Sequence, residues 1–413
     1  MLVVGSGSRD YREYILEAAK TRAGLWLLNP ADPTWEWPHL AGSTRVDVTD
    51  PAAAVAAARE VAAREDVRGV LCYDEALILP AAHVAEALDL PGARVGPVQA
   101  CRDKHTTRVL AAQEGVPQPR SVLVRDLAGA RAAAEEIGYP LVLKPRGLGA
   151  SRGVVKVDWP ADLDEGFAAC SVASYPGVPV YVQSVLVEEF VGGPEISIDG
   201  YVFDGAYHPL FVGHKQVGLA PFFEETGHVV QADDPLLADP ALLALLHDTH
   251  RALGIRQMFT HTEVKLTPHG PRLVEVNGRL GGDLIPYLGK LATGIDPGIV
   301  AVDVATGRRP AVAATVARTA AVRFLYPPYD CRVEAVEGAE QAWSSGVPEG
   351  VGDELVRVFV ESGTELRLPP EGYLTRWAML LCTGPDAETC LAGLDAAEKQ
   401  LALRAVPLAG AHG

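Results

Sequence analysis

Two glutamates twelve residues apart are candidates for binding a divalent cation. Glu263 follows His261 by two positions, and Asn277 follows Glu275 by two positions. Turn-forming residues at 268–271 separate the segments, so we expect a hairpin centred on His269. In that register Glu263 faces Glu275 and His261 faces Asn277. Because strand side chains alternate, all four project from one face.

The facing glutamates define the chemistry of this hairpin. Directly opposed side chains have Cβ atoms roughly 5 Å apart, and facing like charges are destabilising. The pair therefore needs a cation or a shared proton. Two carboxylates and an amide oxygen suit Mg²⁺, which completes its shell with phosphate and water. A hairpin whose glutamates simply face water is the alternative. A zinc deaminase site is excluded because no Pro-Cys-x-x-Cys follows.

A glycine-rich segment follows a strand expected at 141–144. It reads Lys144-Pro145-Arg146-Gly147-Leu148-Gly149-Ala150-Ser151-Arg152-Gly153-Val154. Glycines let the backbone approach an anion closely, and the basic side chains add positive charge. No Gly-Lys-Ser/Thr ends the segment, so it is not a Walker A loop, and an ordinary turn is the alternative. The earlier turn at residues 5–7 lacks the third glycine of a dinucleotide fingerprint.

The elements that position these motifs begin with an open, mostly parallel α/β layer over the first 97 residues or so. Strands are expected at 2–5, 25–28 and 67–73. Asp50-Pro51 predicts the start of a helix that ends near residue 65, and a second helix is expected at 76–88. Alternating strands and helices favour this layer.

The remaining chain mixes helices and strands. The pattern is helical over 99–138, with an extended piece at 121–124, and Gly138 ends the last helix. Strands are expected at 180–190 and 195–203, a helix at 240–253, more strands after 310 and a final helix at 387–403.

Composition narrows the functional class. The chain has 413 residues, a formal net charge of −17 and six cysteines without metal-site spacing. No basic cluster supports nucleic-acid binding, and no 18-residue apolar stretch supports a membrane span. The N-terminus does not resemble a signal peptide. A cytoplasmic protein of two or three domains is therefore expected.

The order and spacing of these motifs resemble the ATP-grasp superfamily over about residues 1–400. The resemblance implies that ATP and Mg²⁺ bind, with Mn²⁺ as a substitute, and that Glu263, Glu275 and Asn277 hold the metal. It also implies the α/β and α+β ATP-grasp fold, with an N-terminal Rossmann-like domain, an ATP lid and a C-terminal mixed sheet. The implied ATP-binding residues are Lys104, Lys144, Gly149, Ser151, Gly153, the hinge residues Glu188, Glu189, Phe190 and Val191, and Glu195 for the ribose.

The same resemblance predicts three regions. Residues 1–97 form the N-terminal α/β domain. Residues 98–310 form the ATP-grasp domain, with a lid subdomain at about 126–192. Residues 311–413 form an α+β region that completes the large domain.

Within the superfamily, residues 221–228 and 277–296 look like the L-amino-acid ligase (dipeptide synthetase) group. The likeness implies catalytic roles for Arg279, His228 and Lys144, and substrate contacts from Glu75, His228, Arg279 and Asp283. Alternatives stay open for three of these residues. Glu75 could be a helix N-terminal acid, His228 a backbone-bonded lid histidine and Asp283 a helix cap. Lys215 and Arg256 are interpreted as surface or lid charges.

The implied reaction joins a carboxylate to an amine through an acyl phosphate and releases ADP and phosphate. The partners would be small carboxylate and amine substrates, such as two amino acids, and a homodimer is left open. One alternative is an ATP-grasp carboxylase that uses bicarbonate. The other is an ATP-binding regulatory protein without turnover, although retention of Glu263, Glu275, Asn277 and Arg279 counts against it.

Overall fold

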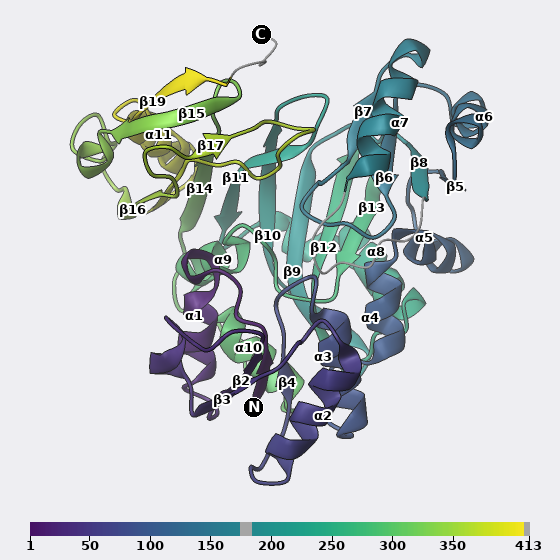
Figure 1. The fold of residues 1–413 in the computed structure, drawn as a ribbon, viewed down its shortest axis with the longest axis vertical. Helices are drawn as coiled ribbons and strands as arrows, with labels where there is room; N and C mark the ends of the chain where they lie inside the picture. The colour runs from purple at the N-terminus through teal and green to yellow at the C-terminus, as the bar shows by residue number, and fades with distance from the viewer. Residues whose placement is uncertain (174–183, 409–413) are drawn as a thin grey trace.

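The N-terminal layer is a parallel four-stranded sheet in the computed structural model, which describes residues 1–173 and 184–408. Its strand order is β3-β2-β1-β4, as expected for an α/β layer (Figure 1). The strands and their helices are β1 (Leu2–Val4), α1 (Arg9–Ala19), β2 (Trp26–Asn29), β3 (Gly42–Arg45), α2 (Pro51–Ala62), β4 (Val70–Leu71) and α3 (Ile78–Ala87).

Two boundaries in this layer, the end of α2 and the start of β4, differ from the prediction by more than two residues. Helix α2 starts as expected, with the Asp50 side chain accepting a hydrogen bond from the Ala52 amide at 2.9 Å, but it ends at Ala62 instead of near residue 65. Strand β4 covers two residues instead of 67–73. Within the part of the chain that the structure describes, it pairs only with the three-residue strand β1, which limits the length of the ladder.

A second four-stranded sheet, which we call the lid sheet, has the order β5-β8-β6-β7. Its elements are β5 (Ser121–Val124), α6 (Leu127–Ile137), β6 (Leu141–Pro145), β7 (Val155–Val157), α7 (Leu163–Val172) and β8 (Val185–Glu189). Apolar residues of α6 and α7 pack against the strands. The sheet includes β5, which precedes the expected lid boundary at 126. Residues 180–183 of the strand expected at 180–190 lie outside the described residues.

The large sheet has eight strands in the order β13-β12-β9-β10-β11-β14-β18-β16. Every described pairing in it is antiparallel, so the expected mixed sheet is wrong. Short turns join β9 to β10 and β12 to β13, and such turns impose antiparallel pairing. The strands are β9 (Glu195–Phe203), β10 (Ala206–Gly218), β11 (Glu224–Gln231), β12 (Met258–Thr267), β13 (Gly270–Asn277), β14 (Thr319–Leu325), β16 (Gly352–Val358) and β18 (Ala378–Gly384).

Five helices support the large sheet and its junctions. They are α4 (Val95–Arg102), α5 (Lys104–Gln113), α8 (Pro240–Ala252), α9 (Ile285–Thr293) and α10 (Pro297–Ala305). At the C-terminal end α11 (Ala387–Glu398) lies near a three-stranded sheet of β15 (Cys331–Glu337), β17 (Glu365–Leu366) and β19 (Ala402–Pro407). The helix expected at 387–403 therefore ends at Glu398, because the last residues pair with β15.

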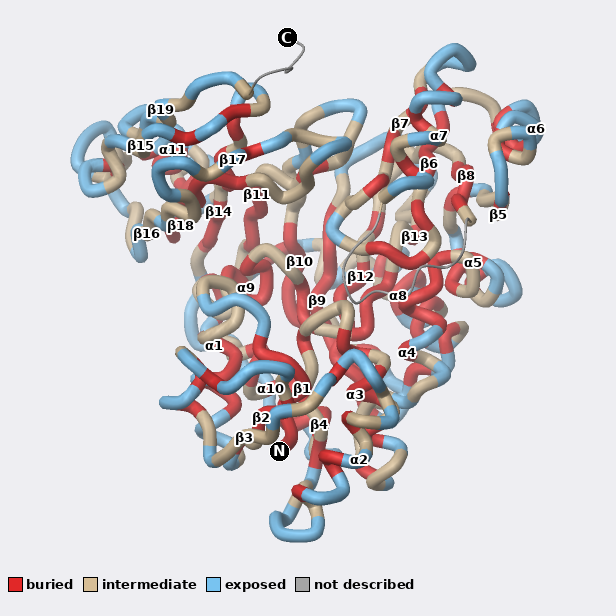
Figure 2. The backbone as a smooth tube through the Cα atoms, viewed as in Figure 1, coloured by how far each residue is buried: buried red, intermediate tan, exposed pale blue. Residues whose placement is uncertain are grey.

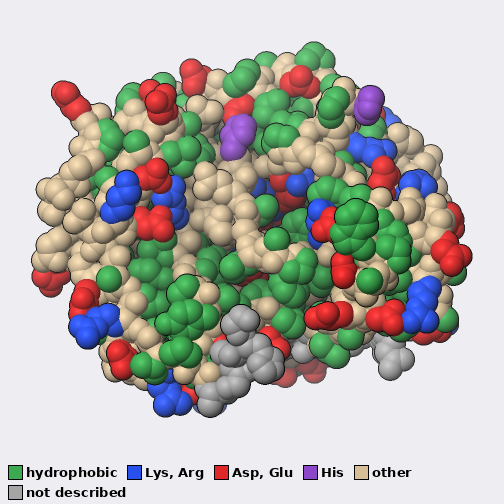
Figure 3. Space-filling view, turned by 90° about the horizontal axis from the view of Figure 1, so that it is seen from above, with side chains coloured by type: hydrophobic (Ala, Val, Ile, Leu, Met, Phe, Trp, Pro, Cys, Tyr) green, Lys and Arg blue, Asp and Glu red, His purple; other side chains and the backbone are tan. Residues whose placement is uncertain are grey.

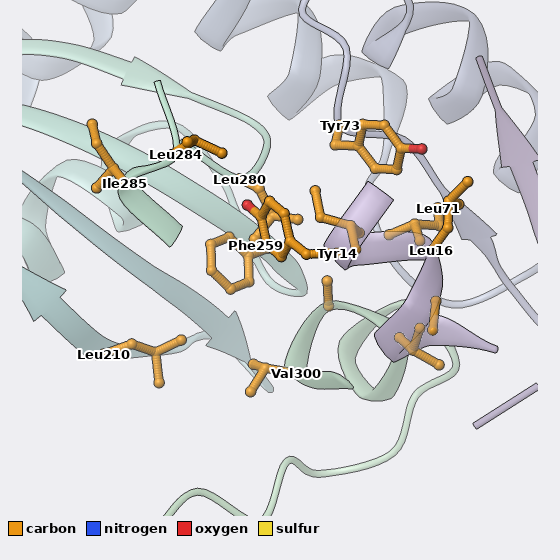
Figure 4. Close-up of a cluster of buried hydrophobic side chains, with 14 of the residues drawn as sticks. Tyr14, Leu16, Leu71, Tyr73, Leu210, Phe259, Leu280, Leu284, Ile285 and Val300 are labelled. Atoms are coloured by element: carbon orange, nitrogen blue, oxygen red, sulfur yellow. The ribbon is translucent and has the colours of Figure 1, made fainter. Parts of the chain in front are cut away.

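A continuous core fixes the N-terminal layer against the large sheet. Buried residues are concentrated along the central strands and beneath them (Figure 2). In the cluster of Figure 4, Leu71 and Tyr73 from the N-terminal layer belong to the same core as Phe259 and Leu280. This packing places the segment after β4 beside the segment after β13. Across the described residues, no helix is long and apolar enough to cross a bilayer.

Candidate active site

One open cleft of about 1220 Å³ lies between the lid sheet and the large sheet. Figure 3 looks down on this face, where acidic and basic side chains lie in a central hollow. The predicted site residues that line the cleft are Lys104, Lys144, Gly149, Ser151, Glu188, Glu189, Phe190, Val191, Glu195, Glu263, Glu275, Asn277, Arg279 and Asp283. Three predicted site residues are not in this lining: Glu75 contacts the lining residue Arg279, His228 contacts the lining residue Glu225, and Gly153 precedes the lining residue Val154.

The hairpin of β12 and β13, which we call the metal-type hairpin, has at its polar end the register that the sequence predicts. Glu263 pairs with Glu275, and His261 pairs with Asn277. A bulge follows Glu263, so that Val264 pairs with Leu273. Because of this bulge, the pairing expected for a hairpin centred on His269 holds from His261 to Glu263 but not for the residues nearer the turn.

Each glutamate of this pair has its own lysine. Lys104 Nζ lies 2.9 Å from Glu275 Oε1, and Lys215 Nζ lies 3.2 Å from Glu263 Oε2. Lys215 also contacts Glu195 and Glu225, each at 2.7 Å, and its side chain is 3% exposed. The interpretation of Lys215 as a surface or lid charge is therefore wrong. Its place on β10, opposite His228 on β11, points it into the site. Arg256 is exposed, as expected.

The oxygen atoms around the hairpin fit a divalent cation. The Asn277 side chain lies beside Glu275 and Glu75, and when its NH₂ group is turned towards them it donates to Glu275 Oε1 at 3.2 Å and to Glu75 Oε2 at 3.3 Å. In the opposite orientation the amide oxygen takes the same place, beside the Glu275 carboxylate, which faces Glu263 across the hairpin. Such an all-oxygen donor set suits Mg²⁺ or Mn²⁺.

His261 is a charged neighbour of this donor set. Its Nδ1 lies 3.1 Å from Asp199 Oδ1 and its Nε2 lies 3.6 Å from Glu263 Oε1. Burial alone would lower the pKa of His261, but Asp199 and Glu263 outweigh burial and raise it to about 9. A protonated imidazole has no lone pair for a metal, so His261 orients Glu263.

The hinge glutamate is held from two sides. Glu188 accepts hydrogen bonds from Arg108 at 2.7 and 3.0 Å and lies 3.0 Å from Lys144 Nζ. Burial opposes its ionisation, but Arg108 and Lys144 hold the pKa of Glu188 well below its usual range. Sequence analysis missed Arg108, which lies on α5, far from the lid in sequence. Its spacing to Lys104, one helical turn away, could have indicated that both face the site.

Glu195 lines the cleft at the start of β9. Its carboxylate is held 2.7 Å from Lys215 and 3.1 Å from Lys265. The predicted ribose-binding carboxylate is thus already paired with two lysines, one of which, Lys215, also contacts Glu263 of the hairpin. Glu189, Phe190 and Val191 provide the adjoining wall.

The glycine-rich loop joins β6 to β7 above the hairpin. Gly149 and Ser151 line the cleft, and Lys104 donates a hydrogen bond to the Leu148 carbonyl. Arg146 donates to both oxygens of Asp103, at 2.6 and 2.7 Å, which anchors the start of the loop to α5. Gly153 lies away from the cleft and has φ +70°, a conformation that favours glycine.

Glu75 forms an ion-pair bridge at the far end of the cleft. It accepts hydrogen bonds from Arg279 Nε at 2.6 Å and from Arg102 at 2.7 Å. Burial opposes ionisation, yet Arg279 and Arg102 lower the pKa of Glu75 to about 2. Glu75 therefore acts as an arginine partner. The local turn is made by Asp74, whose side chain accepts from the Ala76 amide.

Asp283 and His228 form a second buried polar group with Arg376, which sequence analysis missed. Arg376 donates to both Asp283 oxygens, at 2.8 and 2.5 Å, and its guanidinium lies 3.7 Å from the centre of the Phe324 ring. Asp283 does not cap α9, whose N-cap residue is Leu284 without a side-chain bond. No sequence signal links Arg376 to Asp283, since the fold alone joins them.

His228 is buried on β11 between two acids. Its Nε2 lies 3.3 Å from Glu225 and 3.6 Å from Asp283. Burial favours the neutral ring, but the two acids raise the pKa of His228. Among the described residues its ring makes no hydrogen bond to backbone, which argues against the backbone-bonded alternative.

Comparisons with known proteins give consistent matches. The ATP-grasp domain family matches residues 137–287, and the ATP-grasp N-terminal domain family matches residues 31–92. The alanine–anticapsin ligase of Bacillus subtilis is 30% identical over 251 residues, which cover 56% of this chain and 52% of that protein. The chain thus spans about half the length of that relative.

Two further matches cover more of the chain. The phosphoribosylamine–glycine ligase of Phenylobacterium zucineum is 29% identical over 323 residues, which cover 71% of this chain and 74% of that protein. The crystal structure of L-amino acid ligase from Bacillus licheniformis superposes with a TM-score of 0.78 and 25% identity, covering 98% of both chains.

Proposed function

Because this chain belongs to the ATP-grasp superfamily and has its fold, we propose that it is an ATP- and Mg²⁺-dependent carboxylate–amine ligase. It forms an amide bond of the dipeptide type, through an acyl phosphate, and releases ADP and phosphate. The observation that carries the proposal is one cleft that holds the oxygen-rich hairpin, two lysines and, next to them, the half-buried Arg279–Glu75 pair.

The nucleotide end of the cleft supports the first step. Lys104 and Lys144 would neutralise phosphate charge, and the loop with Gly149, Ser151 and Gly153 would cover it. The hinge, Glu188 to Val191, would contact the adenine, and Glu195 the ribose. Glu263, Glu275 and Asn277 would hold Mg²⁺, which supplies charge neutralisation at the phosphates.

The other end of the cleft supports the transfer to an amine. Arg279 follows the metal-type hairpin by two residues and lines the cleft, and its guanidinium would neutralise the acyl phosphate. His228, a buried donor beside Glu225 and Asp283, would stabilise the oxyanion formed when the amine attacks. Glu75 and Asp283 would act near the ammonium groups of the substrates. Both acids are bound by arginines, so they orient those arginines as well.

Amino acids are the proposed substrates because this end of the cleft offers both acidic and basic side chains. Zwitterions need partners of both signs, whereas bicarbonate brings no amine. The same proposal includes the domain boundaries near residues 97 and 310 and a cytoplasmic location, where ATP and amino acids are available.

A screen of amino-acid pairs with Mg-ATP tests the function. We expect pair-dependent release of phosphate, ADP instead of AMP, and a product one water lighter than the two amino acids by mass spectrometry. AMP as the main nucleotide product would contradict acyl-phosphate chemistry. Turnover that requires bicarbonate and gives a carboxylated product would replace the proposal by the carboxylase alternative. ATP binding without turnover under any pair would favour a regulatory protein.

A further inference from the structure

Lys215 lies behind the cleft lining with 3% of its side chain exposed, and none of the proposed steps uses it. Its ammonium group lies within 3.2 Å of three carboxylates, from Glu195, Glu225 and Glu263. These acids come from β9, β11 and β12, so the contact set exists only in the folded sheet. A buried lysine with three acid partners needs an explanation, because burying charges is costly even when they are paired.

The three acids explain why a cation is present at this place. Glu263 faces Glu275 across the hairpin, and Glu195 and Glu225 approach from the neighbouring strands. Without counter-charge these buried carboxylates would repel each other or take up protons. Lys215 supplies one positive charge to all three, and Lys104 does the same for Glu275.

Resting on the proposed function, we propose that Lys215 is a built-in counter-ion that occupies the Glu263 side of the metal site until Mg-ATP arrives. A free divalent cation must compete with the ammonium group for the Glu263 oxygens, and the displaced ammonium gains no new partner. Mg-ATP is a net dianion, so its phosphates offer new partners to both Lys215 and Lys104 as its metal takes their place on the carboxylates. The site therefore admits metal together with nucleotide and resists free metal.

Manganese binding to the nucleotide-free protein tests this directly. Free and bound Mn²⁺ are distinguished by electron paramagnetic resonance, without any turnover. We expect weak binding by the wild-type protein and binding tighter by on the order of tenfold in Lys215→Met, because a close unit charge is removed. Adding Glu263→Gln to Lys215→Met should return the affinity to the wild-type level, which locates the bound metal.

Lys265→Met is the matched control. Lys265 is also a lysine of this cluster, with 14% of its side chain exposed, and its Nζ lies 3.1 Å from Glu195. Among the described contacts it has no ion pair with Glu263. The same charge is removed, so a general electrostatic effect would raise Mn²⁺ affinity equally in both variants. We expect a clearly smaller change in Lys265→Met, and equal changes would overturn the inference.

A second variant keeps the test decisive if Lys215→Met does not fold. The double variant Lys215→Met/Glu225→Gln removes one positive and one negative charge, which preserves the net charge of the cluster. Circular dichroism reports whether each variant folds. Wild-type Mn²⁺ affinity in a folded variant that lacks Lys215 would overturn the inference.

The inference and the proposed function fail separately. The function is judged by ADP formation in the wild-type protein, whereas the inference is judged by Mn²⁺ binding in nucleotide-free variants. An active ligase whose Mn²⁺ affinity is indifferent to Lys215 contradicts only the inference. Tight Mn²⁺ binding by Lys215→Met supports the inference whatever the amide product proves to be.

Discussion

Glu263 and Glu275 lie directly opposite each other on β12 and β13, yet each is paired with a different lysine. Lys215 reaches Glu263 from β10, and Lys104 reaches Glu275 from the start of α5. The cation that the facing acids were expected to need is thus supplied to each of them by a separate lysine. Removing either acid also removes a partner from a buried lysine.

Replacing Glu275 by Gln should abolish ADP formation and also lower stability. The change removes a metal ligand, and it leaves the buried Lys104 with a neutral partner. Losing one partner of such a pair costs about 1–3 kcal/mol. Thermal unfolding and an ADP assay at saturating Mg²⁺ check both expectations. Glu114→Gln is the control, because Glu114 is an exposed partner of Arg251 and does not line the cleft. Loss of a key charge contact typically lowers the rate by roughly two to three orders of magnitude. More than about a tenth of wild-type activity in Glu275→Gln would therefore contradict the metal assignment.

Alanine substitutions separate two glycines of the loop. At Gly153 a Cβ atom would lie 2.4 Å from the Ala173 Cβ and 2.8 Å from the Pro145 Cγ, and φ is +70°. At Gly149 the nearest contact would be 3.6 Å, to Glu75 Cγ. We expect Gly153→Ala to weaken ATP binding severalfold, since a strained residue costs on the order of 1–2 kcal/mol, and Gly149→Ala to have a smaller effect. Titration with a non-hydrolysable ATP analogue measures this. Equal affinities in the two variants would show that the Gly153 conformation is not needed for binding.

His250 should make the protein sensitive to acid. The buried ring lies 2.7 Å from the Leu246 carbonyl and 2.8 Å from Thr260 Oγ1, which suits a neutral imidazole. Burial is the main cause that lowers the pKa of His250 to about 4. The unfolded chain therefore binds a proton that the folded protein does not, and the contribution of His250 to stability is complete above about pH 6.5 and is lost as the pH falls towards 4.

The expected size of this effect is roughly 3 kcal/mol over that interval. Chemical unfolding of His250→Gln between pH 7 and pH 4 should show a shallower loss of stability than the wild-type protein, although its stability at neutral pH is lower. His247→Gln is the control, because His247 is exposed on the same helix. Parallel pH profiles for the wild type and His250→Gln would rule out this histidine as the cause.

Local patterns in the sequence were enough for the hairpin register and the first layer. Side-chain alternation and a short turn determine which residues face each other, and Asp50-Pro51 marks a helix start. Pairings between distant strands were not accessible in this way. The strand that contains Glu188 and the strand that begins at Glu195 follow each other closely, yet they belong to different sheets. Periodicity describes one face of a strand, but it does not identify the neighbouring strand.

The same limit explains the missed site residues. Lys215 lies on β10 and Glu263 on β12, and the fold places only β9 between these two strands. The long side chain of Lys215 can therefore reach across β9 to Glu263. Arg376 reaches Asp283 from a segment far along the chain. A single lysine or arginine outside a motif looks like a solvated charge. Its burial depends on the tertiary fold, which the resemblance to a family indicated only in outline.

The Arg376–Asp283 pair should be a strongly coupled structural unit of the site. The Arg376 side chain is 4% exposed and donates two hydrogen bonds to Asp283, one to the Tyr326 hydroxyl and one to the Glu225 carbonyl. Arg376→Met leaves the Asp283 carboxylate buried near Glu225 without its guanidinium. Removing one partner of a buried pair typically costs about 3–5 kcal/mol, because an uncompensated charge remains.

A double-mutant cycle distinguishes this coupling from simple loss of packing. Asp283→Asn in the Arg376→Met background removes the uncompensated charge, so the double variant should be less destabilised than the sum of the single variants, by on the order of 2 kcal/mol. Arg323 and Asp395 provide the control cycle, since their pair is 2.6 Å apart but Asp395 is exposed. Coupling in that solvated pair should stay below about 1 kcal/mol. Urea unfolding measures both cycles. Strict additivity at Arg376 and Asp283 would mean that the guanidinium acts by filling space against Phe324, and that Asp283 keeps its charge compensated by His228 alone.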